Sequence, residues 1–185
     1  MQEIINQLQA YWLEILIGTL SCVLAFRLSI ALLSRIYFAV YPLPMNQFGF
    51  RGKLVYCDDS PMAKVFVSHK YELSAKPDFI YKIWWNKYAI VEYKSRVGKV
   101  KQSDINQFLA SVVAVRSHYN IREGYIVTGQ DVRHFELEKS TRSIYAQIAH
   151  LHKIARRIKH RGCKPKFSRN QNCNNCGYKG ACHQD

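Results

Sequence analysis

A long apolar stretch near the N-terminus, residues 11–44, constrains the fold of this chain more than any other feature. Its charged residues are Glu14, Arg27 and Arg35. The uncharged run 15–26 has 12 residues, fewer than the roughly 20 that cross a bilayer. The segment from Trp12 to Ser34 reaches that length if the guanidinium of Arg27 extends toward a membrane surface. We therefore expect residues 11–40 to form one transmembrane or membrane-anchoring helix, preceded by a short segment, 1–10.

The flanking charges predict how this helix is oriented. Cationic residues dominate the sequence after the apolar stretch, so the positive-inside rule places the C-terminal domain in the cytoplasm of a single-pass membrane protein. A cleaved signal peptide fits poorly, because residues 1–10 contain no Lys or Arg and the apolar stretch continues too far. An amphipathic or buried core helix is the alternative interpretation.

The rest of the chain is strongly basic. Lys and Arg total 27 against 13 Asp and Glu, which gives a formal charge of +14, and the hydrophobic share of 48% is enough for one packed domain. Nine of the cations lie between Lys153 and the C-terminus, where Asp185 is the only acid. Such a charge indicates a polyanionic partner, either nucleic acid or an anionic membrane surface. A solvated basic tail is the alternative.

From residue 48 onward the pattern changes to short segments rich in β-branched and aromatic residues. Expected strands are 53–57, 64–68, 78–84, 88–94, 124–128 and 132–137. The first two are separated by a turn-rich insert and are predicted to form a hairpin. Helical periodicity begins at Ser103 or Asp104, and again at Ser140 with an end at Gly162. The order predicts an α/β domain over residues 48–162, a mixed sheet flanked by helices.

Three charged residues interrupt the two strands around residue 86. Alternation along 88–94 puts Ile90, Glu92 and Lys94 on one face of the strand. If the preceding strand pairs with it antiparallel through a turn near Asn86, Asp78 falls close to residue 93. The sequence therefore predicts that Asp78, Glu92 and Lys94 converge.

Two carboxylates beside an ammonium form a site of hard oxygen ligands suited to Mg²⁺ or Mn²⁺. A divalent cation between Asp78 and Glu92 would keep both ionised despite their repulsion. Lys94 could orient an attacking water and stabilise negative charge in a phosphoryl transition state. Charged residues on an exposed strand face are the alternative interpretation of the same pattern.

The stretches "KPDFI" and "VEYKS", followed by a helix that carries Gln107 in "QFLAS", resemble the PD-(D/E)XK nuclease superfamily with its restriction-endonuclease-like fold. Within it, residues 53–182 resemble the RecB-type exonucleases associated with CRISPR and recombination systems. The resemblance implies a metal-dependent DNA nuclease in which Asp78, Glu92, Lys94 and Gln107 are catalytic. Asp78 and Glu92 would hold the metal.

Two features depart from the family pattern. Ser111 stands where the family's Q-x3-Y motif has Tyr, and the N-terminal helix that usually supplies a further metal ligand is replaced by the apolar segment. His69 is a candidate for that ligand, although a lone His is more often an ordinary surface residue.

The C-terminal segment, 163–185, contains Cys173, Cys176 and Cys182 in a C-x2-C-x5-C arrangement, the most specific motif of the chain. The RecB-type exonucleases carry such a triplet, which with a fourth cysteine holds a [4Fe–4S] cluster. Cys163 is the favoured fourth ligand because it is near in sequence, and Cys57 is its rival. Zinc, bound by four thiolates or by three with His183 or His160, is the alternative.

These observations favour a membrane-tethered, metal-dependent DNA nuclease. The resemblance further implies that it acts as an exonuclease or on single strands. A catalytically inactive, membrane-anchored DNA-binding module is the second hypothesis, and a zinc-containing adaptor for a protein partner is the third. Aromatic residues such as Trp84, Trp85, Tyr88 and Tyr178 fit either stacking on unpaired bases or packing of the domain.

Overall fold

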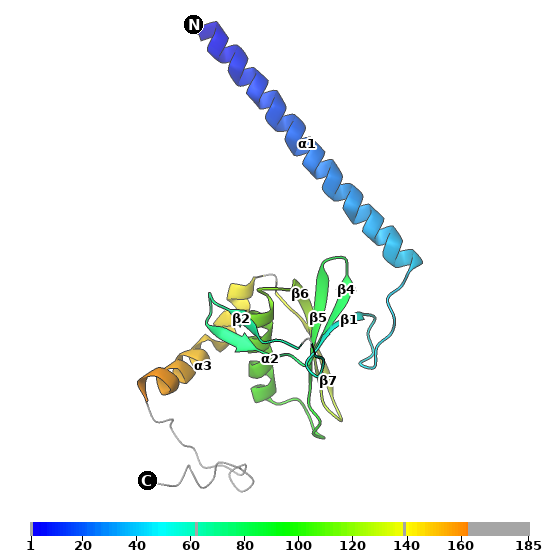
Figure 1. Ribbon diagram of the computed structural model, residues 1–185, viewed down its shortest axis with the longest axis vertical. Helices are drawn as coiled ribbons and strands as arrows, with labels where there is room; N and C mark the ends of the chain where they lie inside the picture. Colours follow the sequence, from blue (N-terminus) through cyan, green and yellow to red (C-terminus); the bar gives the residue numbers. More distant parts are fainter. Residues whose placement is uncertain (1, 62, 139, 163–185) are drawn as a thin grey trace.

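The structure is a computed structural model that describes residues 2–61, 63–138 and 140–162. Its elements follow one another as α1 (Gln2–Val40), β1 (Lys53–Cys57), β2 (Phe66–Ser68), β3 (Leu73–Ala75), β4 (Phe79–Trp84), β5 (Lys87–Tyr93), α2 (Gln102–Val115), β6 (Ile121–Val127), β7 (Val132–Glu136) and α3 (Thr141–Arg161). A long helix projects from a small α/β domain, as Figure 1 shows. The predicted α/β class with a mixed sheet is confirmed.

The main sheet has five strands in the order β1-β4-β5-β6-β7. The pair β5 and β6 is parallel, and the other neighbouring pairs are antiparallel. Helix α2 forms the crossover between the two parallel strands, as a parallel pair requires. The carboxyl ends of β5 and β6 therefore lie at one edge of the sheet, the usual place for a ligand site in an α/β fold.

The predicted hairpin between 53–57 and 64–68 is wrong. Strand β1 pairs antiparallel with β4, while β2 pairs with β3, a short strand that the sequence did not predict. Phe66 and Ser68 of β2 are both buried, and Phe66 belongs to the core that α2 covers. This packing holds β2 against α2, and β1 contacts β2 through side chains, such as the rings of Tyr56 and Phe66, rather than through strand pairing.

The two faces of the sheet are covered differently. Helix α2 covers one face, where Ile80, Ile90 and Ile126 pack with Phe108, and α3 packs beside α2. The loop between α1 and β1 covers the other face, where the ring of Phe50 stacks on Tyr125 with centroids 4.2 Å apart. Both helices thus lie on the face of β5 that carries Ile90 and Glu92.

Local backbone conformation and hydrogen bonds determine where helices α2 and α3 begin and end. The N-cap of helix α2 is Lys101, two residues before Ser103, the earlier of the two predicted starts. The Asp104 carboxylate fixes this start because it accepts a hydrogen bond from the Lys101 amide at 2.8 Å. Helix α3 begins after Ser140 and ends at Gly162, whose φ of 60° is left-handed, as the sequence predicts.

Helix α1 is continuous over 39 residues and stands largely apart from the domain (Figure 1). Its segment Tyr11–Phe38 is long and apolar enough to cross a membrane, with a mean hydropathy of 2.1. None of the most apolar window is buried inside the protein. Within the described residues its end contacts the domain at the turn between β4 and β5, where Phe38 stacks on Trp84.

Candidate active site

The pairing of β4 with β5 brings the three predicted charged residues to one end of the sheet. Phe79 lies opposite Val91, so Asp78, the residue before β4, lies beside the last residues of β5. The amide of Tyr93 donates a hydrogen bond to Asp78 Oδ2 at 2.5 Å. Asp78 and Glu92 therefore approach each other at the carboxyl end of β5, as the alternation and register predict.

Glu92, Lys94 and Gln107 form a closed set of hydrogen bonds. Glu92 Oε1 accepts one from Lys94 Nζ at 2.8 Å and one from Gln107 Nε2 at 2.8 Å. Lys94 Nζ also donates to Gln107 Oε1 at 3.1 Å. An ammonium has three N–H donors, so within the described residues the third N–H of Lys94 is left for a ligand.

The second carboxylate oxygen of Glu92 fits a metal ligand. Glu92 is only 2% exposed, and its Oε2 has no hydrogen-bond partner among the described residues. Burial raises the pKa of the Glu92 carboxyl, and the charge of Asp78 adds to the effect. A buried oxygen without a partner is costly, and a divalent cation would satisfy Oε2 and keep both carboxylates ionised. The donor set therefore suits Mg²⁺ or Mn²⁺.

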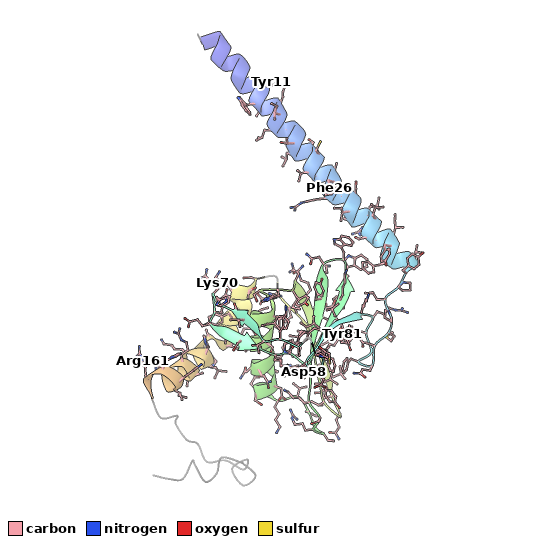
Figure 2. The ribbon with its side chains drawn as sticks, viewed as in Figure 1. Tyr11, Phe26, Asp58, Lys70, Tyr81 and Arg161 are labelled. Carbon is pink, nitrogen blue, oxygen red and sulfur yellow. The ribbon has the colours of Figure 1, made fainter. Side chains whose placement is uncertain are left out.

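Asp58 joins this end of the sheet, and sequence reasoning missed it. Its amide donates a hydrogen bond to the backbone oxygen of Asp78 at 3.0 Å, and Figure 2 shows Asp58 at the end of the sheet away from α1. Burial raises the pKa of Asp78, and the negative charge of Asp58 raises it further. The signal was the acidic pair directly after the strand 53–57, which becomes informative once β1 is paired with β4.

The connection between β5 and α2 is fixed by hydrogen bonds to β6 and the turn after it. The Lys94 amide donates to Val127 O at 2.8 Å, and Thr128 Oγ1 donates to Gly98 O at 2.6 Å. Arg96 forms an ion pair with the buried carboxylate of Asp104 at the start of α2. These contacts hold α2 in the position from which Gln107 reaches Glu92.

The remaining candidate residues lie elsewhere. His69 is exposed in the turn between β2 and β3, on the small sheet that packs against α2. Within the described residues its side chain has no contact with Asp78 or Glu92. Trp84 and Trp85 lie at the turn between β4 and β5, at the opposite end of β5 from Glu92.

Of the cysteines considered as ligands of the cluster, Cys57 lies within the described residues. Cys163, Cys173, Cys176 and Cys182 lie outside the described residues. Cys57 ends β1 as a half-buried free cysteine, and ligand atoms of Cys57, Asp58 and Asp59 lie within 4.8 Å of one another. The rival fourth ligand of the cluster thus lies next to the carboxylates of the candidate active site.

Comparison with known proteins finds a family whose model matches most of the chain. The family model described as the PD-(D/E)XK nuclease superfamily matches residues 21–183. No curated protein shows significant similarity to the chain. The matched region includes the whole sheet, α2, α3 and the carboxylates Asp78 and Glu92.

Proposed function

Since the chain belongs to the PD-(D/E)XK nuclease superfamily, we propose that it is a metal-dependent DNA nuclease tethered to a membrane. Asp78, Glu92, Lys94 and Gln107 would form its active site. The observation that carries this proposal is the buried Glu92 Oε2, which has no hydrogen-bond partner among the residues that the structure describes and lies beside Asp78 and the Lys94 ammonium. Asp78 and Glu92 would hold Mg²⁺ or Mn²⁺, which supplies Lewis acidity toward a phosphodiester when bound.

The protein side chains would position the reactants and balance charge. The free N–H of Lys94 would donate to a phosphate oxygen or to the attacking water, and its positive charge would stabilise the negative charge that develops as water adds to phosphorus. Gln107 would hold the Lys94 ammonium and the Glu92 carboxylate in position relative to each other, since it forms hydrogen bonds with both. The leaving sugar oxygen would depart opposite the attacking water.

Positive charge after β5 and on α3 supports DNA as the substrate. Lys99 and Lys101 are exposed in the connection between β5 and α2, close to Lys94. On α3, a hollow is lined by six basic residues: His152, Lys153, Arg156, Arg157, His160 and Arg161. Cationic side chains of this kind bind a phosphate backbone without regard to sequence.

Three finer assignments are proposals from the sequence. Action on DNA ends or single strands follows from the resemblance to RecB-type exonucleases. A [4Fe–4S] cluster on Cys163, Cys173, Cys176 and Cys182 would anchor the segment after α3. The apolar segment of α1 would hold the nuclease domain at the cytoplasmic face of a membrane.

Hydrolysis of labelled DNA by the full chain in detergent micelles tests the proposed activity. We expect cleavage that needs Mg²⁺ or Mn²⁺, and Lys94→Ala should lower its rate about 10²- to 10³-fold, as loss of one positioned donor to a developing anion does. Glu92→Ala should abolish it. Glu136→Gln, which changes an exposed carboxylate of β7 on the same sheet, should leave the rate unchanged. Equal rates in the wild-type chain and Glu92→Ala would favour an inactive DNA-binding module.

A further inference from the structure

The turn between β4 and β5 meets the end of the apolar helix. Trp84 stacks on Phe38 of α1 with ring centroids 4.7 Å apart. Asn120 Nδ2 donates to Asn86 O at 2.6 Å and fixes the tip of the turn to the start of β6. Trp85 remains 56% exposed, with Lys82 Nζ 5.7 Å from the centre of its ring. The turn therefore presents a large aromatic side chain on a rigid support.

The length of α1 places this turn at a membrane surface. From Trp12 to Ser34 a helix rises about 33 Å, close to the roughly 30 Å of a bilayer's hydrocarbon core. If Trp12 lies at one boundary, Ser34 lies at the other, and the guanidinium of Arg27, whose Cα lies about 10 Å before Ser34 along the helix, extends toward that second boundary. An apolar hollow of α1 residues and Trp85 lies around this boundary, lined by Ile30, Leu33, Ser34, Ile36, Tyr37, Val40, Tyr41 and Trp85. Exposed Trp and Tyr are enriched at this depth of a membrane.

Positive charge accompanies the aromatic residues. A second hollow between α1 and the turn is lined by Arg27 and Lys87, together with Asn86, Asn120, Trp84 and other uncharged residues. No carboxylate lines it, and in the described part of the chain neither Arg27 nor Lys87 forms an ion pair. Two cations beside amide donors suit an anionic phosphate group at the end of the apolar helix.

We propose that the β4–β5 turn and the end of α1 form a docking surface for anionic phospholipid headgroups, with Trp85 at the interface and Arg27 and Lys87 facing phosphate. The docking surface rests on the proposed membrane tether of α1. Because β5 has seven residues and rises about 3.3 Å per residue, the turn and Glu92 lie roughly 20 Å apart. Docking would thus hold the candidate active site at the end of the domain that faces away from the membrane (Figure 1).

Tryptophan quenching in vesicles tests this proposal on the full chain. The sequence has 3 Trp, so Trp12→Phe/Trp84→Phe leaves Trp85 alone, and Trp84→Phe/Trp85→Phe leaves Trp12 alone. Both chains are reconstituted into phosphatidylcholine vesicles, with and without phosphatidylglycerol, that contain lipids brominated near the headgroup. We expect quenching of Trp85, stronger with phosphatidylglycerol.

Charge variants test the headgroup contact. In the chain with Trp85 alone, Arg27→Gln and Lys87→Gln should each lower the ratio of docked to undocked turns about fivefold in anionic vesicles, and quenching should fall accordingly. Lys99→Gln removes the same charge at the opposite end of β5 and should leave the quenching unchanged.

The possible outcomes separate the docking surface from the tether. Quenching of Trp12 without quenching of Trp85 would show that α1 is inserted and would overturn the docking surface alone. Absence of quenching at both positions would overturn the tether and the docking surface together. Equal Trp85 quenching in neutral and anionic vesicles, unaffected by the Arg27 and Lys87 variants, would overturn the role of anionic headgroups.

Discussion

Glu92 combines a buried charge with an oxygen that lacks a hydrogen-bond partner in the described part of the chain. Its raised pKa means that the folded, metal-free protein binds a proton more tightly than the unfolded chain does. The free energy of unfolding of the metal-free protein should therefore fall as pH rises from about 4.5, the ordinary value, through the raised pKa. A bound cation removes this loss because it stabilises the ionised form.

Glu92→Gln should separate metal binding from folding. A ligand at 100 times its Kd stabilises the native state by about 2.7 kcal/mol, so saturating Mn²⁺ should raise the Tm of the wild-type chain by several degrees. The variant should show no such increase, while its metal-free Tm at neutral pH should equal or exceed that of the metal-free wild type. Differential scanning calorimetry in detergent measures both values. A Mn²⁺-dependent rise in the variant would place the metal elsewhere.

Asp58 should control how acid affects the site. Because its negative charge helps to raise the pKa of Asp78, Asp58→Asn should lower that pKa. Protonation of Asp78 releases the metal as pH falls, so Mn²⁺ binding in the variant should persist to a lower pH than in the wild type. Titration of Mn²⁺ binding against pH, followed by electron paramagnetic resonance, locates the midpoint. A midpoint that moves to higher pH would contradict the electrostatic role of Asp58.

At the scale of elements, local sequence patterns predicted much of the fold. They did not predict which strands distant in sequence pair with each other. Alternation along 88–94 and the antiparallel turn placed Asp78 beside Glu92 and Lys94, because register near a short turn is a local property. The residues of β4 that pair with β1 lie 22 to 29 positions away in sequence, and packing selects this partner, since Phe66 of β2 is buried in the core that α2 covers. That choice also brings Asp58 to the site, which explains why sequence reasoning missed it.

Close packing of α2 on β6 depends on Gly124. A Cβ atom at this position would lie 2.1 Å from Phe108 Cζ, and Phe108, 0% exposed, is the neighbour of Gln107 on α2. Gly124→Ala should force the ring and α2 outward and lower the free energy of unfolding by about 1–3 kcal/mol, as overpacking of a core does. Thermal or denaturant unfolding in detergent measures the loss.

Gly129→Ala is the matched control for that substitution. Its added Cβ would have its nearest neighbours at 3.4 Å or more, an ordinary contact distance, so its stability should stay close to that of the wild type. Equal stability of the two variants would contradict the proposed role of Gly124. Displacement of Gln107 should also slow DNA cleavage by Gly124→Ala under conditions in which the variant remains folded.

At the scale of the whole molecule, the distribution of charge and the position of the site agree. All 27 Lys and Arg residues lie at or after residue 27, so none precedes the apolar segment 15–26. If α1 spans a membrane as proposed, the positive-inside rule predicts that the α/β domain lies in the cytoplasm, the side of the membrane where DNA lies. Glu92 lies near the carboxyl end of β5, and Figure 1 shows this end of the strand away from α1, so a tethered domain would present the candidate active site to DNA.

Reporter fusions test this orientation in bacterial cells. Green fluorescent protein fused after Asp185 should fluoresce, and alkaline phosphatase fused at the same position should be inactive, because the first folds in the cytoplasm and the second needs an oxidising compartment for its disulfides. Gln2→Lys/Gln7→Lys/Gln9→Lys adds cations to the part of α1 that precedes the apolar segment, opposes the charge bias and should move a fraction of the molecules to the inverted topology. Active alkaline phosphatase on the chain without these lysines would place the domain outside the cytoplasm and separate the nuclease site from cellular DNA.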